Sequence, residues 1–108
     1  MISEELEISI QNAFEMAKQK KHEFLTIEHL LLQLCKDTEI KKVFKLYKVN
    51  IDKVVKDLEQ FIDNKLKDIV QEDETRPTPS AGFERVLKRA AQHVQSSGKR
   101  EVRALNIL

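Results

Sequence analysis

The chain has few of the residues that end helices and strands, form turns or build many active sites. Its 108 residues include two glycines, two prolines, one cysteine and no tryptophan. Two glycines, Gly82 and Gly98, are too few for a glycine-rich loop that cradles phosphate, so a P-loop nucleotide site is excluded. The single cysteine, Cys35, excludes an internal disulfide and fits a reducing compartment, so we expect a cytoplasmic protein.

Long hydrophobic runs and an excess of one charge are also lacking. The apolar run at residues 30–32 is far too short to span a bilayer, and no signal-peptide pattern opens the chain. Nineteen basic and eighteen acidic residues leave a net charge of +1, so no global field attracts nucleic acid or an anionic membrane. With 41% hydrophobic and 34% charged residues, the composition is typical of one small helical globular domain.

The most apolar stretch is FLTIEHLLLQL at residues 24–34. Thr26 is a favourable N-cap, since its hydroxyl can accept a backbone N–H of the first helical turn. Glu28 places a negative charge at the positive end of the helix dipole. Leu25 and Leu30 flank this start at the spacing of a hydrophobic staple. The leucines that follow leave almost no polar face, so this helix is predicted to be central and buried.

Helical periodicity predicts four further helices around it. The first runs from a Ser3 cap to about Lys20. A short helix after Asp37 or Thr38 buries Ile40, Val43 and Phe44, with Tyr47 as a further candidate, and Asn50 caps the next. The pattern fails from about Leu66, and residues 71–79, with charges and two prolines, are interpreted as a linker. The last full helix begins between Ser80 and Phe83 and stops at residues 96–98, before the first turn of another.

An internal repeat relates the two ends of the chain. Apolar positions of the first helix recur 77 residues later, and a one-residue insertion then aligns residues 23–24 with 101–102. On this alignment Thr26 corresponds to Ala104, which would weaken the second helix start by about 1 kcal/mol. The prediction is an all-α fold of repeated four-helix units. Residues 1–66 form the first repeat, 67–79 a linker, and 80–108 the start of a second repeat that stops after its first helix.

Two separated motifs connect this pattern to a known family. HEFLTIEHLLL at residues 22–32 resembles the motif that opens the Clp N-terminal domain, the double four-helix repeat preceding the ATPase modules of Clp/Hsp100 unfoldases. FERVLKRA at 83–90 and HVQSSG at 93–98 are most similar to the ClpA-type ATP-binding subunits of ATP-dependent Clp proteases. The entry to the last full helix, at residues 79–82, is slightly longer than in that pattern, and the second repeat lacks its last helices.

The resemblance implies a docking module without catalysis or a cofactor of its own. In the family this domain receives adaptors such as ClpS, and protein substrates, for an AAA+ ring that unfolds them into the ClpP peptidase. ATP belongs to the ring modules, outside this segment. The family's adaptor-contacting surface corresponds here to His22, Glu23, Thr78 and Arg85.

The residues alone leave other interpretations open. A helical nucleic-acid-binding domain would use residues 26–35 as a recognition helix, although near-zero net charge argues against it. A small hydrolase would need Cys35 with a histidine, and His22 with His29 would offer at most an adventitious metal site. Basic residues at 18–22 and 99–100 are interpreted as solvated helix ends. Glu23 itself, with Phe24 and Leu25 expected to turn inward, is either a partner contact or an ordinary solvent-facing acid.

Overall fold

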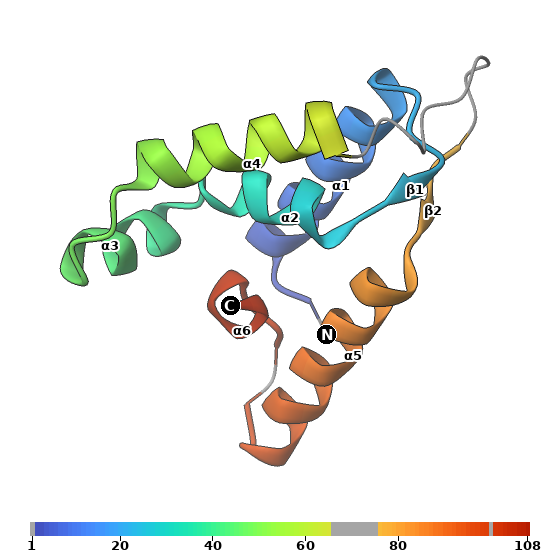
Figure 1. Ribbon diagram of the computed structural model, residues 1–108. Helices are drawn as coiled ribbons and strands as arrows, with labels where there is room; N and C mark the ends of the chain where they lie inside the picture. Colours follow the sequence, from blue (N-terminus) through green and yellow to red (C-terminus); the bar gives the residue numbers. More distant parts are fainter. Residues whose placement is uncertain (1, 66–75, 100) are drawn as a thin grey trace.

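The computed structural model describes residues 2–65, 76–99 and 101–108, and the described part is almost entirely helical (Figure 1). The helices are α1 (Glu4–Gln19), α2 (Ile27–Leu34), α3 (Thr38–Leu46), α4 (Ile51–Lys65), α5 (Ala81–Ser96) and the single turn α6 (Ala104–Ile107). Two short strands, β1 (Phe24–Leu25) and β2 (Thr78–Pro79), pair in parallel. The all-α prediction is confirmed. No helix in this part is long and apolar enough to cross a membrane.

Short polar side chains decide where the helices begin, because each satisfies backbone N–H groups that the first turn leaves without a partner. Ser3 Oγ accepts from Leu6 N–H at 3.2 Å, and Ser80 Oγ accepts from Phe83 N–H at 3.1 Å. The Asp37 carboxylate accepts from the N–H groups of Glu39 and Ile40 at the start of α3. The Asn50 amide oxygen accepts from Lys53 N–H at the start of α4. The caps predicted at Ser3 and Asn50 are therefore confirmed, and Asp37 rather than Thr38 caps α3. Helix α5 begins after its cap Ser80, within the predicted range.

The core surrounds α2, as its leucines predict. Leu30 and Leu34 are fully buried, and α2 contacts both α1 and α4. Phe83, Ala90 and Val94 of α5 belong to the same cluster of buried residues. The second repeat therefore docks its apolar face on the first repeat and shares one core with it.

Two local expectations differ from the structure. Tyr47 is 73% exposed, because α3 ends one residue before it and the chain turns away from the core. Thr78 and Pro79, assigned to the end of the linker, form β2 and pair with β1, since backbone groups rather than a side-chain pattern hold them there. Residues 67–75 of the predicted linker lie outside the described residues.

The two repeats keep a constant offset of 77, and the predicted one-residue insertion is wrong. α1 and α5 begin after Ser3 and Ser80, and their C-terminal turns use positive φ angles of 58° at Lys21 and 74° at Gly98. The N-caps of α2 and α6 are Thr26 and Arg103, so Ala104 is the first helical residue instead of the lost cap. The change of cap type from threonine to arginine hides this register in the sequence.

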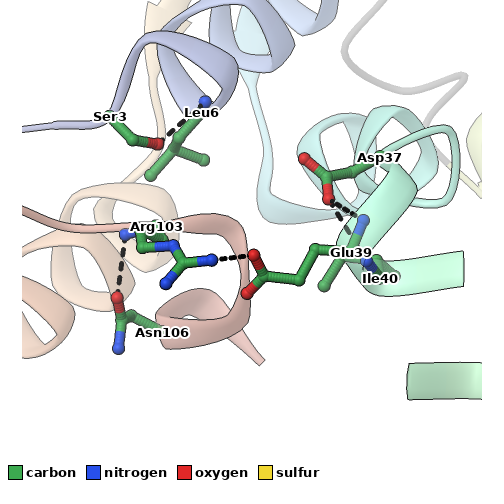
Figure 2. A network of polar contacts seen from close by, with 7 residues as sticks. All are labelled: Ser3, Leu6, Asp37, Glu39, Ile40, Arg103 and Asn106. Atoms are coloured by element: carbon green, nitrogen blue, oxygen red, sulfur yellow. Dashed lines mark hydrogen bonds and ion pairs between the residues drawn. The ribbon is translucent and has the colours of Figure 1, made fainter. Parts of the chain in front are cut away.

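The repeats exchange backbone hydrogen bonds at two equivalent places. Ser80 N–H donates to Leu25 C=O at 2.9 Å, and Ser3 N–H donates to Val102 C=O at 2.7 Å. Each donor precedes the first helix of one repeat, and each acceptor precedes the second helix of the other. An ion pair between Arg103 and Glu39 adds a contact between the entry to α6 and α3 (Figure 2).

Candidate functional site

The structure brings Glu23 and Thr78 together although 54 intervening positions separate them in the sequence. The backbone N–H of Thr78 donates to the backbone carbonyl of Glu23 at 2.9 Å, immediately before the β1–β2 pair. Pairing fixes the backbone of both residues and leaves both exposed. The Glu23 carboxylate is therefore displayed from a rigid connection between α1 and α2.

His22 anchors this connection from inside and does not present its ring to solvent. It is only 3% exposed, and its Nδ1 lies 2.8 Å from Nε2 of the fully buried His29. His29 Nδ1 in turn accepts the backbone N–H of Thr26 at 2.9 Å, and the Thr26 hydroxyl lies 2.8 Å from the same nitrogen. His29 therefore acts locally, as a hydrogen-bond acceptor at the N-terminus of α2. For His22, the resemblance pointed to a partner contact, but the side chain is buried beneath that surface.

The hydrogen-bond network assigns the histidine tautomers. Because a backbone N–H can only donate, His29 Nδ1 must be unprotonated, so the neutral ring carries its hydrogen on Nε2 and donates to His22 Nδ1. Burial lowers the pKa of His29 from 6.5 to about 4, with smaller contributions from neighbouring His22 and Lys20. The pKa of His22 is also lowered, chiefly by burial. Both rings are neutral at pH 7.

Phe24 and Arg85 are also exposed, Phe24 on β1 and Arg85 on α5. Arg85 is exposed in the second turn of α5, the helix that begins directly beyond β2 (Figure 1). Among the described residues, no ion pair joins Arg85 to Glu23. Phe24 is 37% exposed, whereas Leu25 is 3% exposed, so the strand alternates and the expectation that both turn inward is wrong for Phe24. A two-residue strand is too short for this alternation to be recognised in the sequence.

None of the four candidate residues lines either of the two best-defined hollows over the described residues. One hollow, of about 730 Å³, lies instead between α1, the start of α3 and α6. A second, of about 290 Å³, lies between α1, α2 and α4. Small-molecule sites are usually concave, whereas protein partners dock on exposed, rigid surfaces. The geometry at Glu23 and Thr78 therefore suits a macromolecular partner.

The catalytic and metal interpretations lose support from the structure. Cys35 is 5% exposed, and burial raises the pKa of its thiol, which keeps it in the unreactive protonated form. His22 and His29 direct their facing nitrogens at each other. Within residues 2–65, 76–99 and 101–108, no third metal-ligating side chain joins them. The helix at 27–34, which a nucleic-acid reader would insert into a groove, is the buried centre of the fold.

Comparison with known proteins identifies the same family over the whole chain. The family described as "Clp repeat (R) N-terminal domain" matches residues 1–108. A ClpA homologue from Fuscovulum blasticum is 41% identical over 107 residues, which are 98% of this chain and 14% of the relative. The chaperone protein ClpB of Chlamydia pneumoniae is 33% identical over 99 residues, 83% of this chain and 10% of the relative. The chain thus spans a small part of the length of both relatives.

Solved structures share the fold at lower identity. The Hsp104 N-terminal domain from Candida albicans superposes with a TM-score of 0.86 at 20% identity, covering 98% of this chain and 69% of that one. The N-terminal domain of the ClpV1 ATPase from Escherichia coli superposes with a TM-score of 0.84 at 19% identity, covering 98% and 64%. The arrangement of α1 to α6 is therefore that of a known helical repeat domain.

Proposed function

The chain belongs to the Clp N-terminal domain family, and on that premise we propose that it is the adaptor- and substrate-docking module of a ClpA-like AAA+ unfoldase. The module binds proteins and performs no chemistry. A ClpS-like adaptor and protein substrates are its partners, the parent ring hydrolyses ATP, and ClpP degrades the unfolded chain in the cytoplasm.

One observation carries the assignment of the site. The Glu23 carboxylate is exposed, while the backbone carbonyl of Glu23 accepts Thr78 N–H. The neighbouring His22 ring is hydrogen-bonded to His29 of α2. A carboxylate held in this way loses little conformational freedom when a partner binds, which favours affinity. A basic or N–H group of the partner can form a charge-assisted hydrogen bond with it, stronger than one between neutral groups. We place Thr78 and Arg85 in the same contact surface, supported by His22 from beneath.

A paired titration tests the proposal. The protein is titrated by calorimetry with a purified ClpS-like adaptor and, separately, with duplex DNA. The expected result is saturable binding of the adaptor and no binding of DNA. Binding of DNA alone would favour the nucleic-acid interpretation, and failure of the adaptor to bind at high concentration would contradict the proposed docking role.

A further inference from the structure

A second surface of the molecule exposes apolar side chains that the fold does not use. We define the α3–α4 tip as residues 41–56, the end of α3, the turn and the start of α4. Within it Leu46 is 75% exposed, Tyr47 73% and Val49 41%. These three large side chains lie within four consecutive residues, interrupted only by Lys48. Isolated exposed apolar residues are ordinary, but a group of them marks an interaction surface.

The turn that presents these side chains is well defined. Val49 N–H donates to Phe44 C=O at 2.8 Å and Lys48 N–H donates to Lys45 C=O at 3.1 Å. Lys48 adopts a φ of 58°. Together these features form a Schellman motif, which closes the C-terminus of α3 with its last carbonyls satisfied. The apolar group is therefore displayed by an ordered turn between two helices.

The same tip is strongly positive, although the chain as a whole is nearly neutral. Its lysines outnumber its acidic residues six to one, a net charge of +5, while the remainder of the chain has a net charge of −4. All six lysines are exposed: Lys41, Lys42, Lys45, Lys48, Lys53 and Lys56. Lys53 pairs with Asp57 at 3.1 Å. Among the described residues no ion pair involves the other five.

We propose that the α3–α4 tip is a docking surface for an acidic protein segment that also carries apolar side chains. Acidic groups of the partner pair with the lysines, while its apolar side chains cover Leu46, Tyr47 and Val49. Tyrosine contributes strongly to protein interfaces because a large, rigid side chain is buried at low entropic cost. The lysines attract the partner and fix its orientation, whereas the apolar side chains supply the contact that must be desolvated.

Charge segregation favours such a local partner over a long polyanion or a bilayer. A nucleic acid or a membrane extends beyond the tip and meets the rest of the chain, whose net charge is −4. The tip contains no arginine, and Tyr47 is its one exposed aromatic side chain, so it offers little for stacking bases. A short acidic segment can contact the tip alone. Its attraction is felt over roughly 8 Å at physiological salt.

This surface is separate from the candidate site at Glu23. The α3–α4 tip lies at one end of the molecule, and β1 with β2 lies at the other (Figure 1). The inference goes beyond the proposed adaptor contact, because one partner could occupy each end. The two surfaces are tested with different variants, so either proposal can fail while the other holds.

The test uses a fluorescein-labelled peptide of alternating glutamate and leucine, with a lysine–leucine peptide as its charge control. Fluorescence anisotropy is followed as the protein is added. We expect the acidic peptide to bind, the basic peptide not to bind, and the affinity to fall as salt rises. In competition, anionic phosphatidylglycerol vesicles and single-stranded DNA should bind more weakly than the acidic peptide.

Two variants probe the two components of the surface. L46S/Y47S removes apolar contact, and K45Q/K48G removes two charges while glycine retains the positive φ of the turn. Each is expected to weaken peptide binding about tenfold or more with an unchanged circular dichroism spectrum. The matched controls are I8S, which removes an exposed apolar residue of α1, and K18Q. Equal loss in the controls, no loss in the tip variants, no binding of the acidic peptide, or tighter binding of vesicles or DNA would each overturn the proposal.

Discussion

The rings of His22 and His29 are joined by a buried hydrogen bond of 2.8 Å in which Nε2 of His29 donates to Nδ1 of His22. The bond requires neutral rings, because His29 Nδ1 already accepts the backbone N–H of Thr26. It connects the residue before Glu23 to the first turn of the central helix. The two histidines therefore link the exposed candidate site to the core, and they make that link sensitive to acid.

Stability is expected to fall on mild acidification because of His29. Its pKa is about 4 in the folded protein against 6.5 in the unfolded chain, so the unfolded state binds the proton first. The contribution is fully present above pH 6.5 and is lost as pH falls towards 4. We expect about 2 kcal/mol of this loss between pH 7 and pH 5. Urea denaturation at both pH values measures it.

The second repeat supplies the matched variant for this experiment. Asn106 occupies the position of His29, and its Oδ1 accepts Arg103 N–H at 2.8 Å, as His29 Nδ1 accepts Thr26 N–H. His29→Asn should retain the capping acceptor without a titrating ring. The variant is expected to show a much smaller difference in unfolding free energy between the two pH values. An undiminished difference would remove His29 as its cause.

Glu23→Lys should abolish the proposed adaptor contact without disturbing the fold. The substitution replaces attraction by repulsion and leaves a polar group of the partner unpaired, which costs several kcal/mol, or roughly a hundredfold or more in affinity. Stability should change by less than about 0.5 kcal/mol, since the side chain is exposed. Calorimetric titration and thermal melts measure both. Glu15→Lys, with the same charge change on the exposed side of α1, is the control that should bind normally.

Replacing a buried leucine of the central helix α2 by alanine should cost much of the stability of this small domain. Leu30 is 0% exposed, so Leu30→Ala leaves a cavity and is expected to cost about 2–5 kcal/mol. Leu31 is only partly buried, and Leu31→Ala should cost less. Leu46→Ala, at a position 75% exposed, should change stability by less than about 0.5 kcal/mol. A melting temperature that Leu30→Ala leaves unchanged would show that the helix is not central.

The turns that end α1 and α5 are equivalent in the two repeats. Introducing glycine into the first turn should therefore stabilise the protein, and removing glycine from the second should destabilise it. Gly98 has a φ of 74°, which a Cβ disfavours, so Gly98→Ala is expected to destabilise by about 1 kcal/mol. Lys21 has a φ of 58° at the corresponding position, so Lys21→Gly should relieve strain and stabilise slightly. Chemical denaturation of the two variants tests whether Lys21 and Gly98, which lie 77 residues apart, occupy equivalent positions. Destabilisation by both would contradict the equivalence of the two turns.

The amino-acid sequence by itself determined the helices, most of their caps and the family. Helical periodicity and short-range caps such as Ser3 and Asn50 act within a few residues, so they can be recognised in the sequence. The leucines after Thr26 likewise identify the buried helix, because nearly every face of α2 is apolar. The repeat was visible in the apolar positions of α1 and α5. Its register beyond Gly98 was not, because Arg103 replaces the expected cap and Asn106 provides the acceptor.

Tertiary structure alone decided which of the candidate site residues reach the surface together. The bond from Thr78 N–H to Glu23 C=O joins backbone groups that every residue possesses, so no side-chain pattern encodes it. Burial of His22 and exposure of Phe24 depend on how β1 sits between β2 and the core, which is a non-local arrangement. The exposure of Tyr47 also depends on the tertiary arrangement. Its helical spacing predicted burial, but the turn at Lys48 directs the chain away from the core. Local free energies select helices, whereas contacts between distant segments select the surface that a partner meets.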